Sequence, residues 1–511
     1  MSPLSLVPIP SSVHETGGAP LVLDERTRPT GDADAARELT RLIEARTGLR
    51  TRELGGDGGA PATAASAIDL RVEPGGAAES YRLRVAEDGA TVVGADAAGL
   101  FYGVQTLAQL IEPDTEGWVI PAVEIEDAPR FAYRGVMLDV ARHFFDVPAV
   151  RGYIDRAAGL KFNALHLHLT DDQGWRLHLD SRPALTERAS GSSVGGDPGG
   201  FYTKDEYRDL VAYAAARHMI VVPEIDMPGH THAVGLAYPE LAEDPVVTEH
   251  MLEIVSDYGG EPPAAGEAYD GLAVGFSSLR INDEATYDFV ADVFGELASL
   301  TPGPYLHLGG DECLGTDPAD FAAFVARASA IVADLGKTPV TWHEAGAAGG
   351  LHPDTVGQYW GGVTPTDGMD DTARAFVSRG AQVILSPADA VYLDMKPRAD
   401  SDLGLTWANG PTSVRRAYEW EPADVIDGIG EADILGVEAP LWTETVRTPA
   451  DIDALAFPRI AAAAEAAWSP ATGASDQRTW ESFRGRVAGL AGLWDGLGIR
   501  FDAADEIDWV R

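Results

Sequence analysis

The sequence predicts a (β/α)8 barrel, of the TIM-barrel type, preceded by a small α/β domain. From about residue 129 onward, buried-looking strands alternate with amphipathic helices, such as those at 203–218 and 282–300. This alternation is the pattern of parallel βα units. Eight strand candidates follow one another, which is the number that closes such a barrel. They lie at 133–142, 164–171, 219–226, 304–312, 338–345, 355–362, 382–389 and 434–444.

The chain before the barrel has a different pattern. Its candidate elements are a helix at 33–46, strands at 67–73 and 80–86, and a helix at 98–112, with Gly- and Ala-rich loops at 54–66 and 74–78. This part carries no cluster of catalytic residue types. We therefore expect a mixed α/β domain at 1–128, the barrel at 129–485, and a C-terminal helical tail at 486–511 that packs on the barrel.

The charge balance excludes several kinds of partner. Among 511 residues, 80 acids face 38 bases, for a formal net charge of -42. Nucleic acid needs a basic face, and anionic membranes do too, so neither is expected as a partner. The apolar fraction of 45% is that of a globular protein with a sizeable core. The acidic excess therefore predicts a well-solvated, repulsive surface.

The N-terminus and the single cysteine bear on location. Cys313 has no partner for an internal disulfide. The first residues, MSPLSLVPIPSSVHE, lack the basic start and long apolar core of a signal peptide, and no apolar run approaches the roughly 20 residues of a membrane span. We expect a soluble cytoplasmic protein, or a secreted one if the N-terminus has been trimmed.

Polar and aromatic residues gather where the barrel strands end, which is where barrel enzymes place their active sites. The ends of an otherwise apolar series of strands carry Arg142, Asp171, Asp172, Asp226, Asp311, Glu312, Trp342, Trp360, Trp442 and Glu444, with Tyr392 and Asp394 just past the seventh strand. This distribution predicts one functional rim.

A metal-dependent hydrolase is one possible interpretation of the rim. In the stretch HLH, His166 and His168 point the same way on a strand and could act as two ligands. They lie inside the strand, however, and no further ligands are evident at later strand ends. His230 and His232, in PGHTH, are a weak signal by themselves. The sequence favours hydrogen-bonded core histidines over a metal centre.

Nucleotide cyclisation is a second interpretation, because GGDE at 309–312 opens the signature of diguanylate cyclases. That signature continues with phenylalanine on a hairpin, in a much smaller fold. In this sequence Cys313 follows instead, at the end of a parallel strand. We therefore set the cyclase hypothesis aside.

Glycoside chemistry fits the rim best. It needs an acid for the leaving oxygen and stabilisation of an oxocarbenium-like transition state. Tryptophans suit the flat apolar faces of sugar rings, while Arg, Asp and Glu bind the hydroxyls. The chain has 11 tryptophans, three of them at strand ends. The rim thus predicts a sugar pocket.

The adjacent acids Asp311 and Glu312 constrain the mechanism. The usual retaining mechanism places two carboxyls about 5 Å apart on opposite sides of the bond. Neighbours on one strand project in different directions, so this pair cannot easily serve as acid and nucleophile. If Glu312 is the acid, the nucleophile comes from elsewhere, and the substrate could supply it.

Several ordered motifs together resemble the family 20 glycoside hydrolases, the β-N-acetylhexosaminidases, over nearly the whole chain. They are GLFYGVQTLAQL (99–110), YRGVMLDVARHF (133–144), KFNALHLHLTDDQGWR (161–176), VPEIDMPGHTHA (222–233), LHLGGDE (306–312) and LWTE (441–444). The resemblance implies a small α/β domain beside a catalytic (β/α)8 barrel. It implies no cofactor or metal, and a substrate whose own 2-acetamido oxygen is the nucleophile, with an oxazolinium intermediate and retention of configuration. The partners it implies are N-acetylhexosamine-terminated oligosaccharides or glycoconjugates.

The resemblance also implies a role for each rim residue. Glu312 would be the general acid/base, while Asp311 would hold the acetamido N–H and Tyr392 would bond the acetamido oxygen. Other residues would bind the substrate: Trp342, Trp360 and Trp442 as walls of the acetamido pocket, Arg142 on O3 and O4, Asp394 and Glu444 on O4 and O6, and Trp407 as a platform for the next sugar.

Asp171, Asp226 and His230 match a supporting network in this family, which would orient Glu312 and tune its proton affinity. A buried network that only holds loops is the alternative for these three residues. A non-catalytic sugar-binding barrel is the alternative for the whole chain, although both Asp311 and Glu312 are present. The segment at 243–282 could shape the aglycone side or form a mobile loop. Neither the choice between glucosamine and galactosamine configurations nor the oligomeric state follows from the sequence.

Overall fold

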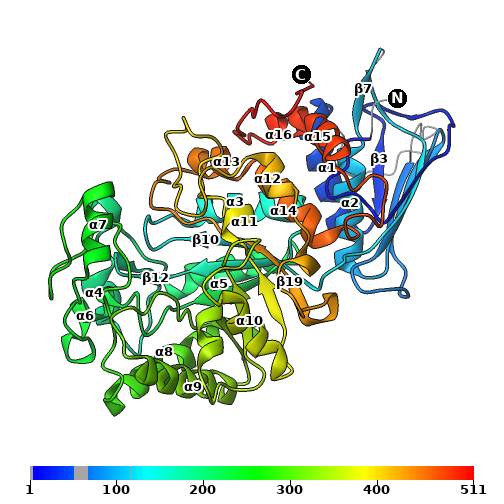
Figure 1. Cartoon of the computed structure of the whole chain (residues 1–511). Helices are drawn as coiled ribbons and strands as arrows, with labels where there is room; N and C mark the ends of the chain where they lie inside the picture. Colours follow the sequence, from blue (N-terminus) through cyan, green and yellow to red (C-terminus); the bar gives the residue numbers. More distant parts are fainter. Residues whose placement is uncertain (1–3, 51–66, 116, 511) are drawn as a thin grey trace. The chain divides into compact units, whose positions relative to one another are not determined.

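The computed structural model describes residues 4–50, 67–115 and 117–510 (Figure 1). The loop expected at 54–66 lies outside these residues. The chain forms two compact units. One contains the described residues up to Ala132, with 156–162 and those from Phe457 onward, and the other contains Tyr133–Asp155 and Asn163–Ala456. No described helix has both the length and the apolar character needed to span a membrane.

The first unit is built on a six-stranded sheet. Its strands lie in the order β1 (Ser12–Glu15), β9 (Val123–Asp127), β5 (Tyr81–Ala86), β6 (Gly89–Gly94), β4 (Ala67–Val72) and β3 (Arg28–Gly31). A smaller sheet contains β2 (Leu21–Leu23), β8 (Gly117–Ile120) and β7 (Glu112–Asp114). The predicted helices correspond to α1 (Ala33–Thr47) and α2 (Ala97–Gln109).

The C-terminal residues of the first unit form α14 (Arg459–Trp468), α15 (Trp480–Ala488) and α16 (Ala491–Gly496). A buried bidentate ion pair joins two of these helices: the Arg486 guanidinium donates to both carboxylate oxygens of Glu465, at 2.6 and 2.7 Å. The tail at 486–511 is thus helical only in part, and its packing on the barrel stays a prediction.

The second unit is a closed barrel of eight parallel strands, as the sequence predicts. In order they are β10 (Tyr133–Asp139), β11 (Ala164–His168), β14 (Ile220–Glu224), β15 (Tyr305–His307), β16 (Thr338–Trp342), β17 (Val356–Tyr359), β18 (Val383–Leu385) and β19 (Ile434–Ala439). β10 pairs with β19 and closes the ring. All eight strands end before the predicted position, so most polar residues of the rim lie in the segments that follow the strands.

The helices around the barrel have clear sequence signals. Those that follow β10, β14, β15 and β17 include α3 (Val147–Gly159), α8 (Glu284–Leu300), α9 (Pro318–Asp334) and α10 (Met369–Ser378). Helix α5 (Lys204–Ala215) precedes β14 and begins with a capping box, in which Thr203 and Glu206 each accept from the other's backbone N–H. The helices predicted at 203–218 and 282–300 are therefore confirmed.

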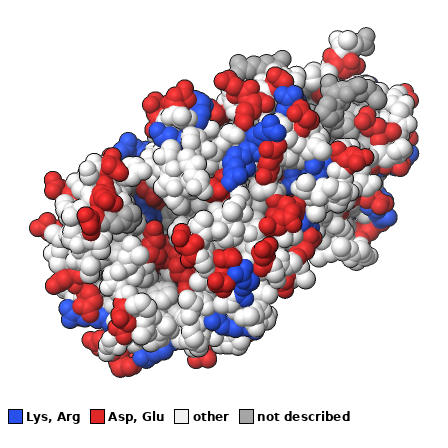
Figure 2. Space-filling view, in the orientation of Figure 1, with Lys and Arg blue, Asp and Glu red and all other residues white. Residues whose placement is uncertain are grey.

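The barrel interior is layered. An apolar layer contains Tyr133, Ala164, Val222, Val340, Val356 and Ile384. Two residues further along their strands, on the same face, stand the polar or aromatic residues His166, Glu224, Trp342 and Gln358. The pocket therefore lies above a polar layer and not directly above an apolar core. Figure 2 shows that on the visible face acidic side chains are spread widely with basic ones among them, as the net charge of -42 predicts.

The loop after β15 carries the acidic pair and depends on two glycines. Gly309 has φ 67° and Gly310 has φ 93°, in the left-handed region that glycine tolerates. A Cβ on Gly309 would stand 1.8 Å from Oδ1 of Asp226. The Gly310 N–H donates to the same Oδ1 at 2.9 Å. The chain therefore turns tightly around the Asp226 carboxyl group before it presents the two acids.

Gly309→Ala should lower the melting temperature clearly more than Gly336→Ala does. Gly336 also has a positive φ, 75°, but a Cβ there meets nothing within 4 Å. Gly336→Ala therefore measures only the destabilisation caused by a positive φ at a residue with a Cβ, about 1–3 kcal/mol. Gly309→Ala must in addition displace the buried Asp226. Calorimetric melting of both variants checks this. Equal shifts would show that the Asp226 contact does not constrain the turn.

Candidate active site

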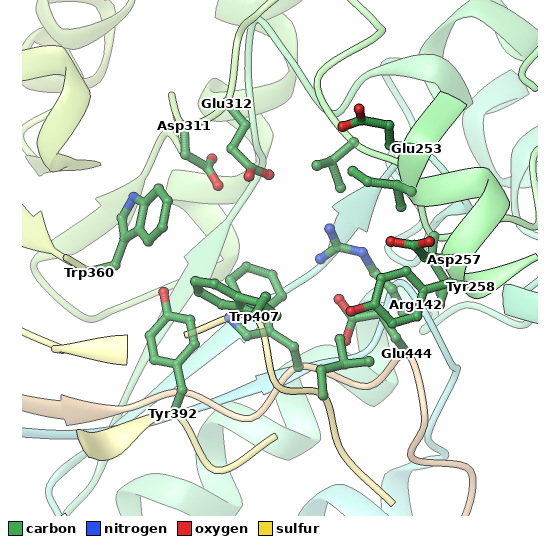
Figure 3. A pocket seen from close by; sticks show the side chains of 15 residues that line it. Arg142, Glu253, Asp257, Tyr258, Asp311, Glu312, Trp360, Tyr392, Trp407 and Glu444 are labelled. Carbon is green, nitrogen blue, oxygen red and sulfur yellow. The ribbon is translucent and has the colours of Figure 1, made fainter. Parts of the chain in front are cut away.

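A cavity of about 460 Å³ opens at the C-terminal end of the barrel strands (Figure 3). This volume suits a small-molecule site. Most of the predicted site residues line it: Arg142, Asp311, Glu312, Trp360, Tyr392, Trp407, Trp442 and Glu444. The structure thus brings together side chains that are as much as 302 positions apart in the chain.

Two predicted binding residues lie behind the cavity wall instead of on it. Trp342 is fully buried and packs in one cluster with Tyr392 and Trp442. Its indole N–H donates to Oε1 of Glu224 at 2.9 Å. Asp394 is also buried, and the Trp442 backbone N–H donates to its Oδ1 at 3.4 Å. In this structure both residues support the lining from behind.

Asp311 and Glu312 both reach the cavity, and Figure 3 shows their side chains entering from the same loop. The expectation that they project in different directions rested on strand geometry and is wrong. β15 ends at His307, and Glu312 has a strained φ of 45°, which turns it toward the cavity. Since the two carboxyls come from one side, they still do not straddle a bond.

His230 stands next to this pair. Its Nε2 lies 3.8 Å from Oδ2 of Asp311 and 3.6 Å from Oε2 of Glu312, while its Nδ1 lies 3.2 Å from Oδ1 of Asp171. Burial alone would lower the pKa of His230. The negative charges of Asp171, Asp311 and Asp226 outweigh burial and raise the pKa well above its usual range. A protonated His230 therefore places a positive charge within 4 Å of both carboxyls of the acidic pair.

Asp171 connects His230 to Arg142. Arg142 Nη1 lies 2.8 Å from Oδ2 of Asp171, and the Nε2 of His168 is also 2.8 Å from that oxygen. Although burial opposes ionisation, Arg142 and His230 lower the pKa of Asp171. The Arg142 guanidinium also lies 4.8 Å above the Trp442 ring. These contacts fix Arg142 at one end of the cavity.

Asp226 and Asp311 form a second buried acidic pair. Burial, followed by the charge of Asp311, raises the pKa of Asp226 well above its usual range. Burial also raises the pKa of Asp311 itself, against the nearby His230. Two such carboxyls cannot both ionise cheaply, so Asp226 keeps its proton and Asp311 carries the charge. Because burial raises the pKa of Asp226 further than that of Asp311, Asp311 is the carboxyl of this pair that ionises first.

Tyr392 and Glu444 complete the polar lining. Burial, followed by the charges of Asp394 and Asp311, raises the pKa of Tyr392 well above its usual range, so its hydroxyl stays neutral and can donate a hydrogen bond. Burial raises the pKa of Glu444 to about 7 despite the nearby Arg142. Figure 3 shows Tyr392 on the side of Asp311 and Trp360, with Glu444 beside Arg142. The cavity therefore has two chemically different ends.

The histidines of HLH belong to the polar layer of the barrel. His166 contacts Glu438 at 2.8 Å and Glu224 at 3.1 Å, and His168 bonds Glu224 and Asp171. These carboxylates outweigh burial and raise the pKa of His166 to about 10 and that of His168 to about 9. The geometry could also hold a metal ion, because His307 brings a third ring nitrogen to Glu224 at 3.0 Å. As hydrogen-bonded here, protonated imidazoles supply the positive charge.

The sequence prediction missed three sets of residues. His307 and Glu224 join the histidine network although they lie on different strands. Glu344, two residues after Trp342, accepts a bond from Trp360. Helix α7 (Glu249–Tyr258), inside the segment at 243–282, lines the cavity with Glu253, Ile254, Asp257 and Tyr258. Of these, only the helical spacing in α7 was visible in the sequence.

The comparisons with known proteins agree with this site. The model of the catalytic domain of glycosyl hydrolase family 20 matches residues 131–317 and 317–471, and that of domain 2 of the same family matches residues 4–128. The β-N-acetylhexosaminidase of Cellulomonas fimi is 41% identical over 522 residues, which cover 100% of this chain and 98% of that protein.

Solved structures extend the similarity to the whole fold. A family 20 β-N-acetylglucosaminidase is 63% identical with a TM-score of 0.92, and the match covers 100% of both chains. A variant of the Streptomyces plicatus β-hexosaminidase, solved in complex with its product GlcNAc, is 42% identical with a TM-score of 0.86, over 99% of this chain and 98% of that one. With the barrel, the acidic pair and the aromatic pocket in place, this chain belongs to glycosyl hydrolase family 20, as its ordered motifs predict.

Proposed function

We propose that this glycoside hydrolase is a retaining exo-β-N-acetylhexosaminidase that uses the substrate's acetamido group as its nucleophile. One observation carries the proposal: the Asp311 carboxyl group, the Tyr392 hydroxyl and the Trp360 ring lie together at one end of the cavity. An acetamido group needs an acceptor for its N–H, a donor for its carbonyl oxygen and a flat apolar contact. This end of the cavity offers all three.

The reaction proceeds in two displacements at C1. Glu312 donates its proton to the glycosidic oxygen as the C1–O bond breaks, while the acetamido oxygen forms a bond to C1. Asp311 holds the N–H and stabilises the positive charge of the resulting oxazolinium ion. Water then attacks C1, Glu312 takes its proton, and the C1–O bond to the acetamido oxygen breaks. Two inversions at C1 give overall retention.

The other end of the cavity binds the sugar hydroxyls. Arg142 and Glu444 line it, and Asp394 supports it from behind. Trp407 is 48% exposed at the cavity, a position suited to the sugar that leaves. The substrates are therefore oligosaccharides or glycoconjugates that end in β-linked N-acetylhexosamine. The N-acetylglucosaminidase and hexosaminidase relatives support this class.

Purified protein should release the chromophore from aryl β-N-acetylhexosaminides, and dialysis against a strong chelator should leave the rate unchanged. The reason is that carboxylates, Tyr392 and protonated histidines supply every charge and proton that the mechanism uses. Chromophore release with and without chelator is the measurement. Loss of activity that a divalent ion restores would favour the metal-hydrolase interpretation of His166 and His168.

Glu312→Gln should lower kcat by about 10²–10⁴-fold on substrates with poor leaving groups, because it removes the proton donor and little else. Activated aryl leaving groups need less protonation and should lose less. Steady-state rates over a series of leaving groups check this, with Glu249→Gln on the exposed side of α7 as the matched control. An equal loss across the series would count against Glu312 as the acid.

A further inference from the structure

A third carboxyl group, from Glu344, stands behind the acetamido end of the cavity. Glu344 lies in the short 3-10 helix η3 (His343–Ala347) that directly follows β16. Both of its carboxylate oxygens face the same donor, the indole N–H of Trp360, at 3.0 and 3.1 Å. Among the described residues no other acceptor for this N–H is found. The proposed reaction uses Asp311 and Glu312 and gives Glu344 no part.

The remaining contacts of Trp360 are made by ring faces and edges alone. Its ring meets His343 edge-on at 5.5 Å and Trp407 edge-on at 5.9 Å. It is only partly buried and packs against the cluster that includes Trp342, Tyr392 and Trp442. Contacts of this kind tolerate rotation about the side-chain bonds, whereas a hydrogen bond at the indole nitrogen fixes the ring plane.

The position of Glu344 is unfavourable for a carboxyl group. Burial, followed by the charges of Asp311 and Glu312, raises its pKa well above the usual range. The titratable groups around it are Asp311, Glu312, Tyr392 and the adjacent His343, whose pKa burial lowers to about 3. None of these groups supplies a compensating charge at neutral pH. Of the contacts that Glu344 makes, the bond from Trp360 is the one that links it to a residue lining the cavity.

We propose that Glu344 is a positioning residue that holds the Trp360 ring plane and thereby sets the size of N-acyl group that the cavity accepts. The inference rests on the proposed function, because Trp360 limits the space where the acetamido group must lie to attack C1. Misplacement of about 1 Å at such a step costs on the order of 10²-fold. Released from Glu344, the ring gives way to larger acyl groups and holds the acetyl group less well.

Glu344→Ala should lower kcat on an aryl N-acetylglucosaminide about 10- to 100-fold, with a smaller change in KM. It should also reduce the preference for N-acetyl over N-propionyl substrate several-fold. Glu344→Gln keeps an acceptor oxygen and should restore most of both quantities. Glu249→Ala removes an exposed carboxylate that does not line the cavity and should leave the acyl preference unchanged.

A double-mutant cycle separates this role from a general structural one. Trp360→Phe keeps a ring but lacks the N–H, so it should reproduce the loosened acyl preference even if Glu344→Ala fails to fold. Adding Glu344→Ala to Trp360→Phe should change that preference little further, since the bond is already absent. Additive effects, or an unchanged preference in Trp360→Phe, would overturn the inference. Wild-type protein inactive on N-acetylhexosaminides would instead contradict the proposed function.

Discussion

Buried negative charge above the barrel core is the constraint on which the site depends. Glu224 lies at the centre of this polar layer: it bonds His166 and His168, accepts from the Trp342 indole N–H, and lies 3.0 Å from Nδ1 of His307. A carboxylate without partners would be costly at this depth, and these donors lower the pKa of Glu224 well below its usual range although burial opposes them. The network thereby fixes Trp342, against which Tyr392 and Trp442 pack. The polar layer thus lies between the apolar layer of the barrel interior and the cavity.

Buried negative charge also determines which carboxyl groups near the cavity are protonated. Because there are fewer positive charges than carboxyl groups, only the carboxyl groups that lie beside a positive charge ionise readily. Asp171 is ionised because Arg142 and His230 face it, whereas Asp226 retains its proton beside Asp311. Asp311 can then hold an amide N–H while Glu312, on the same loop, faces the leaving oxygen. The tight turn through Gly309 and Gly310 places both acids on one side, which leaves the role of nucleophile to the substrate.

The sequence predicts the barrel well because its strands are buried apolar runs, and all eight were found. The C-terminal ends of the strands were predicted too far along the chain, as at β15, which ends at His307 because the glycines at 309 and 310 then turn the chain. Rim residues such as Arg142, Asp311 and Glu444 could be predicted because they lie at or just after the ends of the predicted strands. Other features depend on packing between distant segments and could not be predicted. They are the burial of Trp342 and Asp394 behind the cavity wall, the Glu344–Trp360 bond, and the proximity of His307 to Glu224. Helix α7 lies in the segment at 243–282, for which the sequence left a role in shaping the aglycone side and a mobile loop as alternatives.

The central claim is that the acetamido oxygen attacks C1, and its electron density is the quantity to vary. The most direct measurement is kcat/KM of the wild-type protein on aryl N-acetylglucosaminides whose acetyl methyl carries zero, one, two or three fluorines. Fluorine withdraws electron density from the carbonyl oxygen with little change in size. The account predicts a stepwise fall in rate with each fluorine. Rates indifferent to fluorination, or a sugar trapped covalently on an enzyme carboxylate, would contradict it.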